Sequence, residues 1–237
     1  MQETFYTIKT KKNIPPFTVA LIADLHGAPT KPVLASLQKQ KPDMIAIAGD
    51  LRPGEQAPYP LEFLSQCAAL SPVYYSLGNH EKTMSEADQE EIASAGVTVL
   101  DNTWTVFKDG IFIGGLTSPY VTHWRKYEKD TGKPLLPETA WLADFEKQPG
   151  FKLLLDHHPE NYPKVTKNRN IDLILSGHAH GGQIRIKGRG LFAPGQGFFP
   201  KYTGGVYDGR LVISRGLANT TLIPRLGNPP ELVYISI

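Results

Sequence analysis

The stretch that decides the fold is FTVALIADLH, at residues 17–26. Its apolar, β-rich first part predicts a buried strand, and two polar residues, Asp24 and His26, follow that strand. The pattern recurs at residues 44–50, where the apolar run of MIAIAGD ends in an aspartate. Residues 31–40 between them have a helical pattern. A strand, a helix and a second strand in this order predict parallel strands covered by helices.

The alternation continues along the chain and predicts an α/β fold. We expect further helices at 61–70, 85–95 and 139–147, and further strands at 73–77, 152–155, 173–175, 183–186 and 232–235. Hairpins are predicted where 103–108 meets 111–116 around Asp109-Gly110, and where 206–207 meets 211–214 around Asp208-Gly209. Without a repeat or a linker, the 237 residues favour one domain, 1–237, with two sheets.

Composition excludes some classes of protein. The 25 Lys and Arg against 23 Asp and Glu leave a net charge of +2, too slight to indicate a nucleic-acid partner. The single cysteine, Cys67, excludes an intrachain disulfide, and we expect a buried structural thiol. With no spanning apolar run and no signal-like segment near the start, we expect a cytoplasmic protein. A missing N-terminal segment would make it membrane-associated or exported instead.

Metal-binding residue types gather at the ends of the predicted strands. Five of the seven histidines lie there, which random placement would not produce. Open α/β sheets bind ligands at the carboxyl ends of their strands. The residues concerned are Asp24, His26, Asp50, Asn79, His80, His157, His178 and His180.

This set of ligands indicates the kind of metal. Aspartate, histidine and asparagine without a thiolate suit Mn, Fe, Zn or Co. The set is too large for one tetrahedral site. Two ions that share one carboxylate and one hydroxide would use it fully.

The order of these motifs resembles a known family. Asp-x-His, Gly-Asp, Gly-Asn-His-Glu, a lone His and Gly-His-x-His, between Asp24 and His180, are similar to the calcineurin-like metallophosphoesterases. Beyond them, the sequences at 181–183, 193–194, 214–216 and 228–232 resemble the bacterial YkuE/YaeI-type branch. The resemblance implies a four-layer α/β/β/α sandwich with two mixed sheets. It also implies hydrolysis of a phosphomonoester or phosphodiester.

Residue by residue, the resemblance implies two divalent metal ions, Mn, Fe, Zn or a mixture. One ion would be held by Asp24, His26, Asp50 and His180, and the other by Asp50, Asn79, His157 and His178. A bridging hydroxide would attack phosphorus, and His80 would protonate the leaving oxygen. A non-catalytic scaffold of the same fold and a nuclease are the alternatives. The substrate would be a phosphate ester, with membrane-derived esters as one candidate, and the oligomeric state stays open.

Some residues keep two interpretations. Arg52 either reaches a substrate anion or lies solvated in a loop, and His158 either makes loop hydrogen bonds or contacts substrate. The loop at 118–137 is either a lid over the site or an ordinary surface loop. The aromatic residues of the last third either line a substrate rim or pack the second sheet, and we favour packing. These aromatics are Phe192, Phe198, Phe199 and Tyr202.

Overall fold

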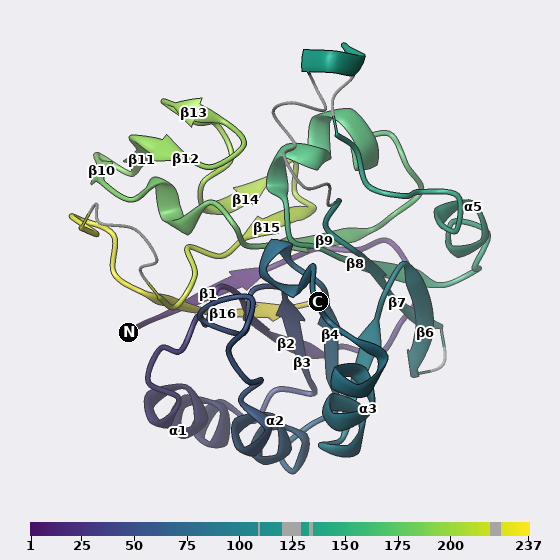
Figure 1. Ribbon diagram of the computed structural model, residues 1–237. Coiled ribbons are helices and arrows are strands. Elements are labelled where there is room, and N and C mark those ends of the chain that lie inside the picture. Colours follow the sequence, from purple (N-terminus) through teal and green to yellow (C-terminus); the bar gives the residue numbers. More distant parts are fainter. Residues whose placement is uncertain (109, 120–128, 133–134, 219–223) are drawn as a thin grey trace.

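The computed structural model describes residues 1–108, 110–119, 129–132, 135–218 and 224–237, and within them two six-stranded sheets pack face to face (Figure 1). Helices cover the outer face of each sheet, so the layers run α/β/β/α. Both sheets are mixed, because parallel and antiparallel pairs occur in each. The predicted fold class is confirmed.

The first sheet has the order β1-β16-β2-β3-β4-β5. Its strands are β1 (Gln2–Thr7), β16 (Glu231–Ser236), β2 (Thr18–Ile22), β3 (Met44–Ala48), β4 (Val73–Ser76) and β5 (Val97–Leu100). Strands β2 to β5 are parallel, and their outer face carries α1 (Lys31–Gln40), α2 (Leu61–Ala68) and α3 (Glu86–Ser94). Helix α3 begins as predicted, with Ser85 and Asp88 in a capping box. Strands β1 and β5 were not predicted.

The second sheet has the order β14-β15-β9-β8-β7-β6. Its strands are β14 (Gly205–Tyr207), β15 (Leu211–Ile213), β9 (Leu173–Ser176), β8 (Phe151–Asp156), β7 (Ile111–Leu116) and β6 (Thr103–Lys108). Both predicted hairpins form, although Asp109 lies outside the described residues. The outer face carries α5 (Leu142–Phe145) and two short helices, η2 (Pro159–Asn161) and η3 (Tyr162–Thr166). Helix α5 is shorter than the helix predicted at 139–147.

The side chains of each central strand alternate between two cores. In β2, Val19 and Leu21 point into the core between the sheets, whereas Ala20 and Ile22 point toward α1 and α2. Because both faces are buried, the strand is apolar throughout, as parallel strands between two layers usually are. This explains why the run at 18–22 lacks the alternation of a half-exposed strand.

Two small hairpins lie outside the large sheets, at the upper left of Figure 1. They are β10 (Arg185–Ile186) with β11 (Arg189–Gly190), and β12 (Phe192–Ala193) with β13 (Gly197–Phe198). The packing prediction holds for Tyr202, which is buried in the outer core of the second sheet. It is wrong for Phe198 and Phe199, which are 74% and 80% exposed.

None of the helices in the described part of the chain has the length and apolar character needed to span a bilayer.

Candidate metal centre

The eight predicted site residues all lie at the carboxyl ends of strands. Asp24 and His26 follow β2, Asp50 follows β3, and Asn79 and His80 form the short helix η1 (Asn79–Glu81) after β4. His157 follows β8 of the second sheet, while His178 and His180 follow β9, with His180 opening the short helix η4 (His180–Gly182). The centre therefore lies where the carboxyl ends of the strands of both sheets come together.

Asp50 lies in the middle of the cluster. Its Oδ2 is 3.4 Å from Nε2 of His26 and 3.2 Å from Nε2 of His157. Nε2 of His80 is 4.0 Å from the same oxygen. The other carboxylate oxygen, Oδ1, accepts a hydrogen bond from the backbone N–H of His80 at 2.9 Å. This bond fixes the carboxylate so that Oδ2 faces the imidazoles.

Asp24 is the second carboxylate of the centre. Its Oδ1 lies 3.5 Å from Nε2 of His180, 3.9 Å from that of His26 and 4.0 Å from that of His157. Among the described residues, four groups of three side chains could each hold an ion. They are Asp24-His26-His180, His26-Asp50-His80, Asp24-Asp50-His157 and His157-His158-His178.

Two imidazoles are oriented by backbone carbonyls, and a third, that of His180, lies beside both a carbonyl and the guanidinium of Arg225. Nδ1 of His157 donates to the carbonyl of Ala48 at 2.6 Å. Nδ1 of His26 donates to that of Arg52 at 3.1 Å, and Nδ1 of His180 faces that of Ala218 at 3.3 Å. A proton held on Nδ1 leaves the lone pair on Nε2, which faces the carboxylates.

Several polar atoms of the centre are buried without a hydrogen-bond partner in the described part of the chain. They are Nε2 of His26 and of His157, Nδ1 of His80, and Oδ1 of Asn79. Buried polar atoms almost always have a partner, because leaving one unpaired is costly. Imidazole nitrogens and amide oxygens can each donate a lone pair to a divalent cation. The residues present therefore fit metal ions.

The backbone is strained at the centre. Five of the seven predicted ligands have positive φ: Asp24 (52°), His26 (40°), Asp50 (57°), His178 (62°) and His180 (45°). Positive φ is uncommon outside glycine, and each such residue costs on the order of 1 kcal/mol or more. Strain of this kind collects at functional sites, where the surrounding structure holds side chains in fixed directions.

The glycines that precede Asp50 and Asn79 make room for the ligands. A Cβ on Gly78 would lie 2.2 Å from Oδ1 of Asp50, and one on Gly49 would lie 2.5 Å from Nδ1 of His157. Neither position tolerates a side chain without moving a predicted ligand. The glycines in the Gly-Asp and Gly-Asn-His-Glu motifs are therefore needed for close approach, beyond the backbone freedom expected from sequence.

Around Asp50 and Asp24 the centre has a negative field, whereas burial lowers the pKa of His80, His178 and His180. Burial alone would lower the pKa of His157, but the carboxylates of Asp50 and Asp24 raise it to about 10. Burial would likewise raise the pKa of Asp50, yet His157 and His26 hold it well below its ordinary value. Such a field favours bound cations.

Glu81 belongs to the Gly-Asn-His-Glu motif, from which the sequence predicts no role for it. It is buried, and its carboxylate accepts hydrogen bonds from the backbone N–H groups of Asp50 (2.8 Å), Leu51 (3.1 Å) and Gly78 (2.8 Å). It thereby ties the loop after β3 to the loop after β4. In the sequence, the only indication of this role is that Glu81 belongs to the Gly-Asn-His-Glu motif.

Arg52 is not a solvated loop residue. It is 4% exposed, and its Nε donates to the carbonyl of His80 at 3.1 Å. A second nitrogen donates to Oγ1 of Thr83 at 2.6 Å, and the guanidinium lies over the ring of Tyr59 at 4.7 Å. Arg52 therefore holds the backbone that carries His80.

His158 makes loop hydrogen bonds, one of the two interpretations that the sequence allows. Its Nδ1 lies 3.1 Å from Oε1 of Glu160, and the same oxygen is 3.6 Å from Nε2 of His178. Of the proposed lid, residues 120–128 and 133–134 lie outside the described residues.

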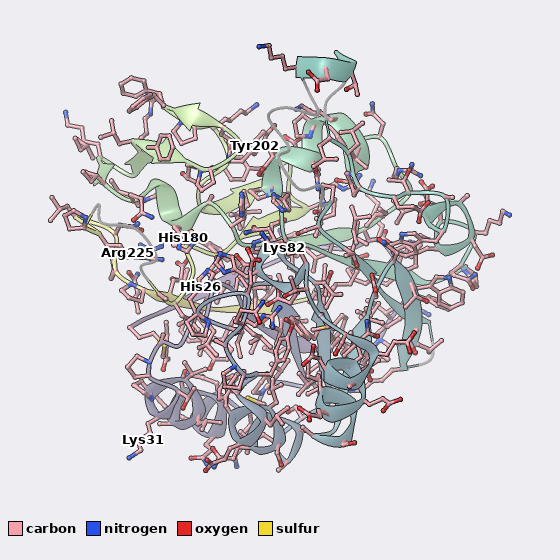
Figure 2. All side chains as sticks on the ribbon, in the orientation of Figure 1. His26, Lys31, Lys82, His180, Tyr202 and Arg225 are labelled. Atoms are coloured by element: carbon pink, nitrogen blue, oxygen red, sulfur yellow. The ribbon has the colours of Figure 1, made fainter. Side chains whose placement is uncertain are left out.

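Sequence reasoning missed Arg225. One of its guanidinium nitrogens lies 3.3 Å from Nδ1 of His180, and another donates to the carbonyl of Gly216 at 3.3 Å. Figure 2 shows Arg225 beside His180 and His26. No motif surrounds Arg225 in the sequence, so there was no signal for its position.

The sequence matches the family described as calcineurin-like phosphoesterase over residues 17–182. The chain belongs to this family. It is 27% identical over 239 residues to YpbG of Bacillus subtilis, covering 98% of this chain and 85% of that protein. It is 29% identical over 198 residues to phosphodiesterase YaeI of Escherichia coli, covering 74% of this chain and 65% of that protein.

Metallophosphoesterase YkuE of Bacillus subtilis is 35% identical over 91 residues, or 37% of this chain and 31% of that protein. The predicted family and branch are therefore confirmed. Solved structures with some likeness include the phosphoesterase Yfce of E. coli, with 18% identity, a TM-score of 0.36 and coverage of 71% of both chains. Membership of this family, together with the His and Asp groups, supports metal-dependent hydrolysis of phosphate esters.

Proposed function

We propose that the chain is a dimetal phosphoesterase with Asp50 shared between two ions. Asp24, His26 and His180 complete the first ligand set, and Asn79, His157 and His178 complete the second. The observation that carries this proposal is the position of Oδ2 of Asp50, 3.4 Å from an imidazole of the first set and 3.2 Å from one of the second. Two divalent ions at such a centre lower the pKa of bound water and neutralise phosphoryl charge.

The protein's contribution is to orient these groups. Backbone carbonyls turn His26 and His157 toward Asp50, and Glu81 holds the two loops that carry Asp50 and Asn79. Because each ligand set draws on both sheets, we propose that residues 1–237 act as one metallophosphoesterase domain.

His80 is proposed as the general acid. Its side chain is 30% exposed, whereas those of His26, His157, His180 and His178 are 1%, 0%, 6% and 11% exposed. A group that delivers a proton to a leaving oxygen must reach the substrate. Among the histidines compared, His80 has the most exposed side chain. Such catalysis contributes roughly 10²–10⁴-fold.

The test combines metal analysis with a substrate panel. Purified protein is supplied with Mn²⁺, Zn²⁺ or Fe²⁺, its metal content is measured, and phosphomonoesters and phosphodiesters are assayed. We expect two ions per chain and metal-dependent turnover. Asp50→Ala and Asn79→Ala should abolish turnover, while Glu91→Gln, at an exposed position of α3 on the outer face of the first sheet, should leave it unchanged.

Each alternative has its own outcome. No bound ion after Mn²⁺ addition would support a non-catalytic scaffold, and undiminished turnover in metal-stripped Asp50→Ala would exclude the proposed site. A nuclease would hydrolyse nucleic acid and bind it with a steep dependence on salt.

A further inference from the structure

One end of the molecule exposes large apolar side chains. Ile186, Phe198 and Phe199 are 65%, 74% and 80% exposed, and all three lie within residues 185–202, the segment that we call the hairpin rim. Leu226, 56% exposed, adjoins the rim because the N–H of Arg185 donates to its carbonyl. Figure 1 shows the rim strands β10 to β13 projecting at the upper left.

The fold gains little from the exposed ring of Phe199. Phe199 has a φ of 52°, a left-handed conformation that is unfavourable for a bulky side chain and favours glycine. A glycine or asparagine would relieve this strain. The aromatic ring at this exposed position is therefore better explained by contact with another molecule or a membrane than by a contribution to the stability of the fold.

The rim is also strongly cationic. Residues 173–207 contain Arg185, Lys187, Arg189 and Lys201 and no aspartate or glutamate. Lys187, Arg189 and Lys201 are exposed. The charged residues of the rim segment itself are thus all cationic, although the whole chain carries only +2.

The rim borders the metal centre directly. The N–H of Leu191 donates to the carbonyl of Gly182, in the helix that begins with His180, and the N–H of Phe199 donates to the carbonyl of Leu191. On the other side, a Cβ on Gly195 would lie 2.0 Å from Oε1 of Glu160, which faces His178. The rim and the centre therefore share one edge of the molecule.

We propose that the hairpin rim docks on an anionic lipid membrane surface. Phenylalanine and isoleucine side chains insert at the boundary between headgroups and acyl chains, and Lys and Arg bind anionic headgroups. The apolar residues stand on two-residue strands and their turns, a shape that suits insertion into lipid better than a flat protein interface. The metal centre then faces the headgroup layer. Docking is independent of the proposed function, because none of the predicted ligands takes part in it.

The test is co-sedimentation of the full chain with vesicles of phosphatidylcholine alone, or with about 30% phosphatidylglycerol added. We expect binding to the anionic vesicles, weakening as salt rises. The double substitution Phe198→Ser and Phe199→Ser should lower the partition coefficient at least tenfold, since each ring buries apolar surface in lipid. Thermal unfolding checks that this variant is folded.

Charge is tested with a matched pair of triple variants. Replacing Lys187, Arg189 and Lys201 by Gln should weaken binding roughly 10²-fold, at about fivefold per cation. Replacing Lys11, Lys31 and Lys39 by Gln removes the same charge and should leave binding unchanged; Lys31 begins α1, at the lower left of Figure 2, whereas the rim strands lie at the upper left. Asp50→Asn should bind vesicles as the wild type does, which separates docking from catalysis.

Three results would overturn the proposal. The first is no partition of the wild type onto anionic vesicles at low salt. The second is equal partition of the wild type and the double serine variant. The third is a dimer in sedimentation velocity that the serine variant abolishes, without vesicle binding, since the rim would then contact a second copy of the chain.

Discussion

Nε2 of His157 lies 3.2 Å from Oδ2 of Asp50, although His157 follows β8 of the second sheet and Asp50 follows β3 of the first. The contact exists only when the two sheets are packed on each other. The inner core that packs them is almost wholly apolar, with Leu21, Ala46 and Leu153 among its members. Formation of the centre and packing of the sheets are therefore linked, and metal binding should stabilise the packed state.

Gly78→Ala should remove metal binding without a substitution at any ligand. The added Cβ would lie 2.2 Å from Oδ1 of Asp50 and 2.7 Å from its backbone nitrogen, so the carboxylate must move. We expect turnover to fall by roughly 10²-fold or more, since a displaced ligand loses several kcal/mol of metal-derived stabilisation. Metal content by elemental analysis and turnover with a phosphodiester measure this.

Gly54→Ala is the control for that variant. Nothing lies within 4 Å of a Cβ at Gly54, so metal content and turnover should match the wild type. Normal metal content in Gly78→Ala would show that metal binding does not need the carboxylate of Asp50 at the position we propose.

Arg52→Met should lower turnover while leaving metal content unchanged. The guanidinium donates to the carbonyl of His80 and to Thr83, so its loss frees the backbone beneath His80 but touches no predicted ligand side chain. Groups that orient a site residue are typically worth about 10–100-fold. The turnover number should fall, whereas the Michaelis constant stays close to that of the wild type. A raised Michaelis constant with normal turnover would instead support contact between Arg52 and substrate.

Much of the site could be predicted because strand ends converge. Asp24 and Asp50 follow neighbouring parallel strands, so their side chains had to meet at one edge of the sheet. The family resemblance added the second sheet, which brings His157 and His178 to the same edge. Apolar runs of four to six residues were sufficient to place most of the strands, since each strand is buried on both faces.

The remaining features depend on contacts that sequence does not encode locally. Strands β1 and β16 come from opposite ends of the chain, and no sequence pattern in either strand indicates that the two pair. Arg225 reaches His180 only through the fold. Phe198 and Tyr202 are both aromatic and close in sequence, yet one is exposed and the other buried, because local composition does not show which side faces the core.

His80→Ala should slow poor leaving groups more than good ones. A general acid matters most when the leaving oxygen is basic, so we expect a loss of roughly 10²–10⁴-fold with an alkyl or phenyl ester. With a p-nitrophenyl ester, whose leaving group needs little protonation, the loss should be much smaller. Rates across a series of aryl esters measure this. An equal loss for every ester would indicate that His80 is a ligand, as the His26-Asp50-His80 group allows.

Glu81→Gln should destabilise the fold around the centre. The carboxylate accepts from three backbone N–H groups, and an amide can offer only one oxygen to them. Hydrogen bonds to a charged group contribute about 1.5–3 kcal/mol each, so we expect the free energy of unfolding to fall by about 2–4 kcal/mol. Urea unfolding of metal-free protein measures this. Glu62→Gln, at an exposed position of α2, should change it by less than about 0.5 kcal/mol.

Cys67 should react with thiol reagents only when the chain opens. The thiol is fully buried between α2 and the first sheet, and burial raises its pKa from 9.0 to about 12. Because the thiolate is the reactive form, roughly one thiol in 10⁴ is ionised in the folded state at pH 8. We expect no modification of folded protein over hours, and one equivalent after addition of denaturant. A rapid reaction of the folded protein would contradict the buried thiol.

The same shift makes stability depend on pH in a defined window. Since the pKa is higher in the folded state, the neutral thiol is favoured there, and its full contribution to stability is present below pH 9. Between pH 9 and about pH 12 the unfolded state loses its proton first, so stability falls as pH rises. Buried tyrosines also titrate in this range, with the pKa of Tyr162 and Tyr234 raised to about 12 by burial. The effect of Cys67 is therefore the difference between the wild type and Cys67→Ala: the free energy of unfolding should fall more steeply with pH in the wild type, and parallel curves would refute the assignment.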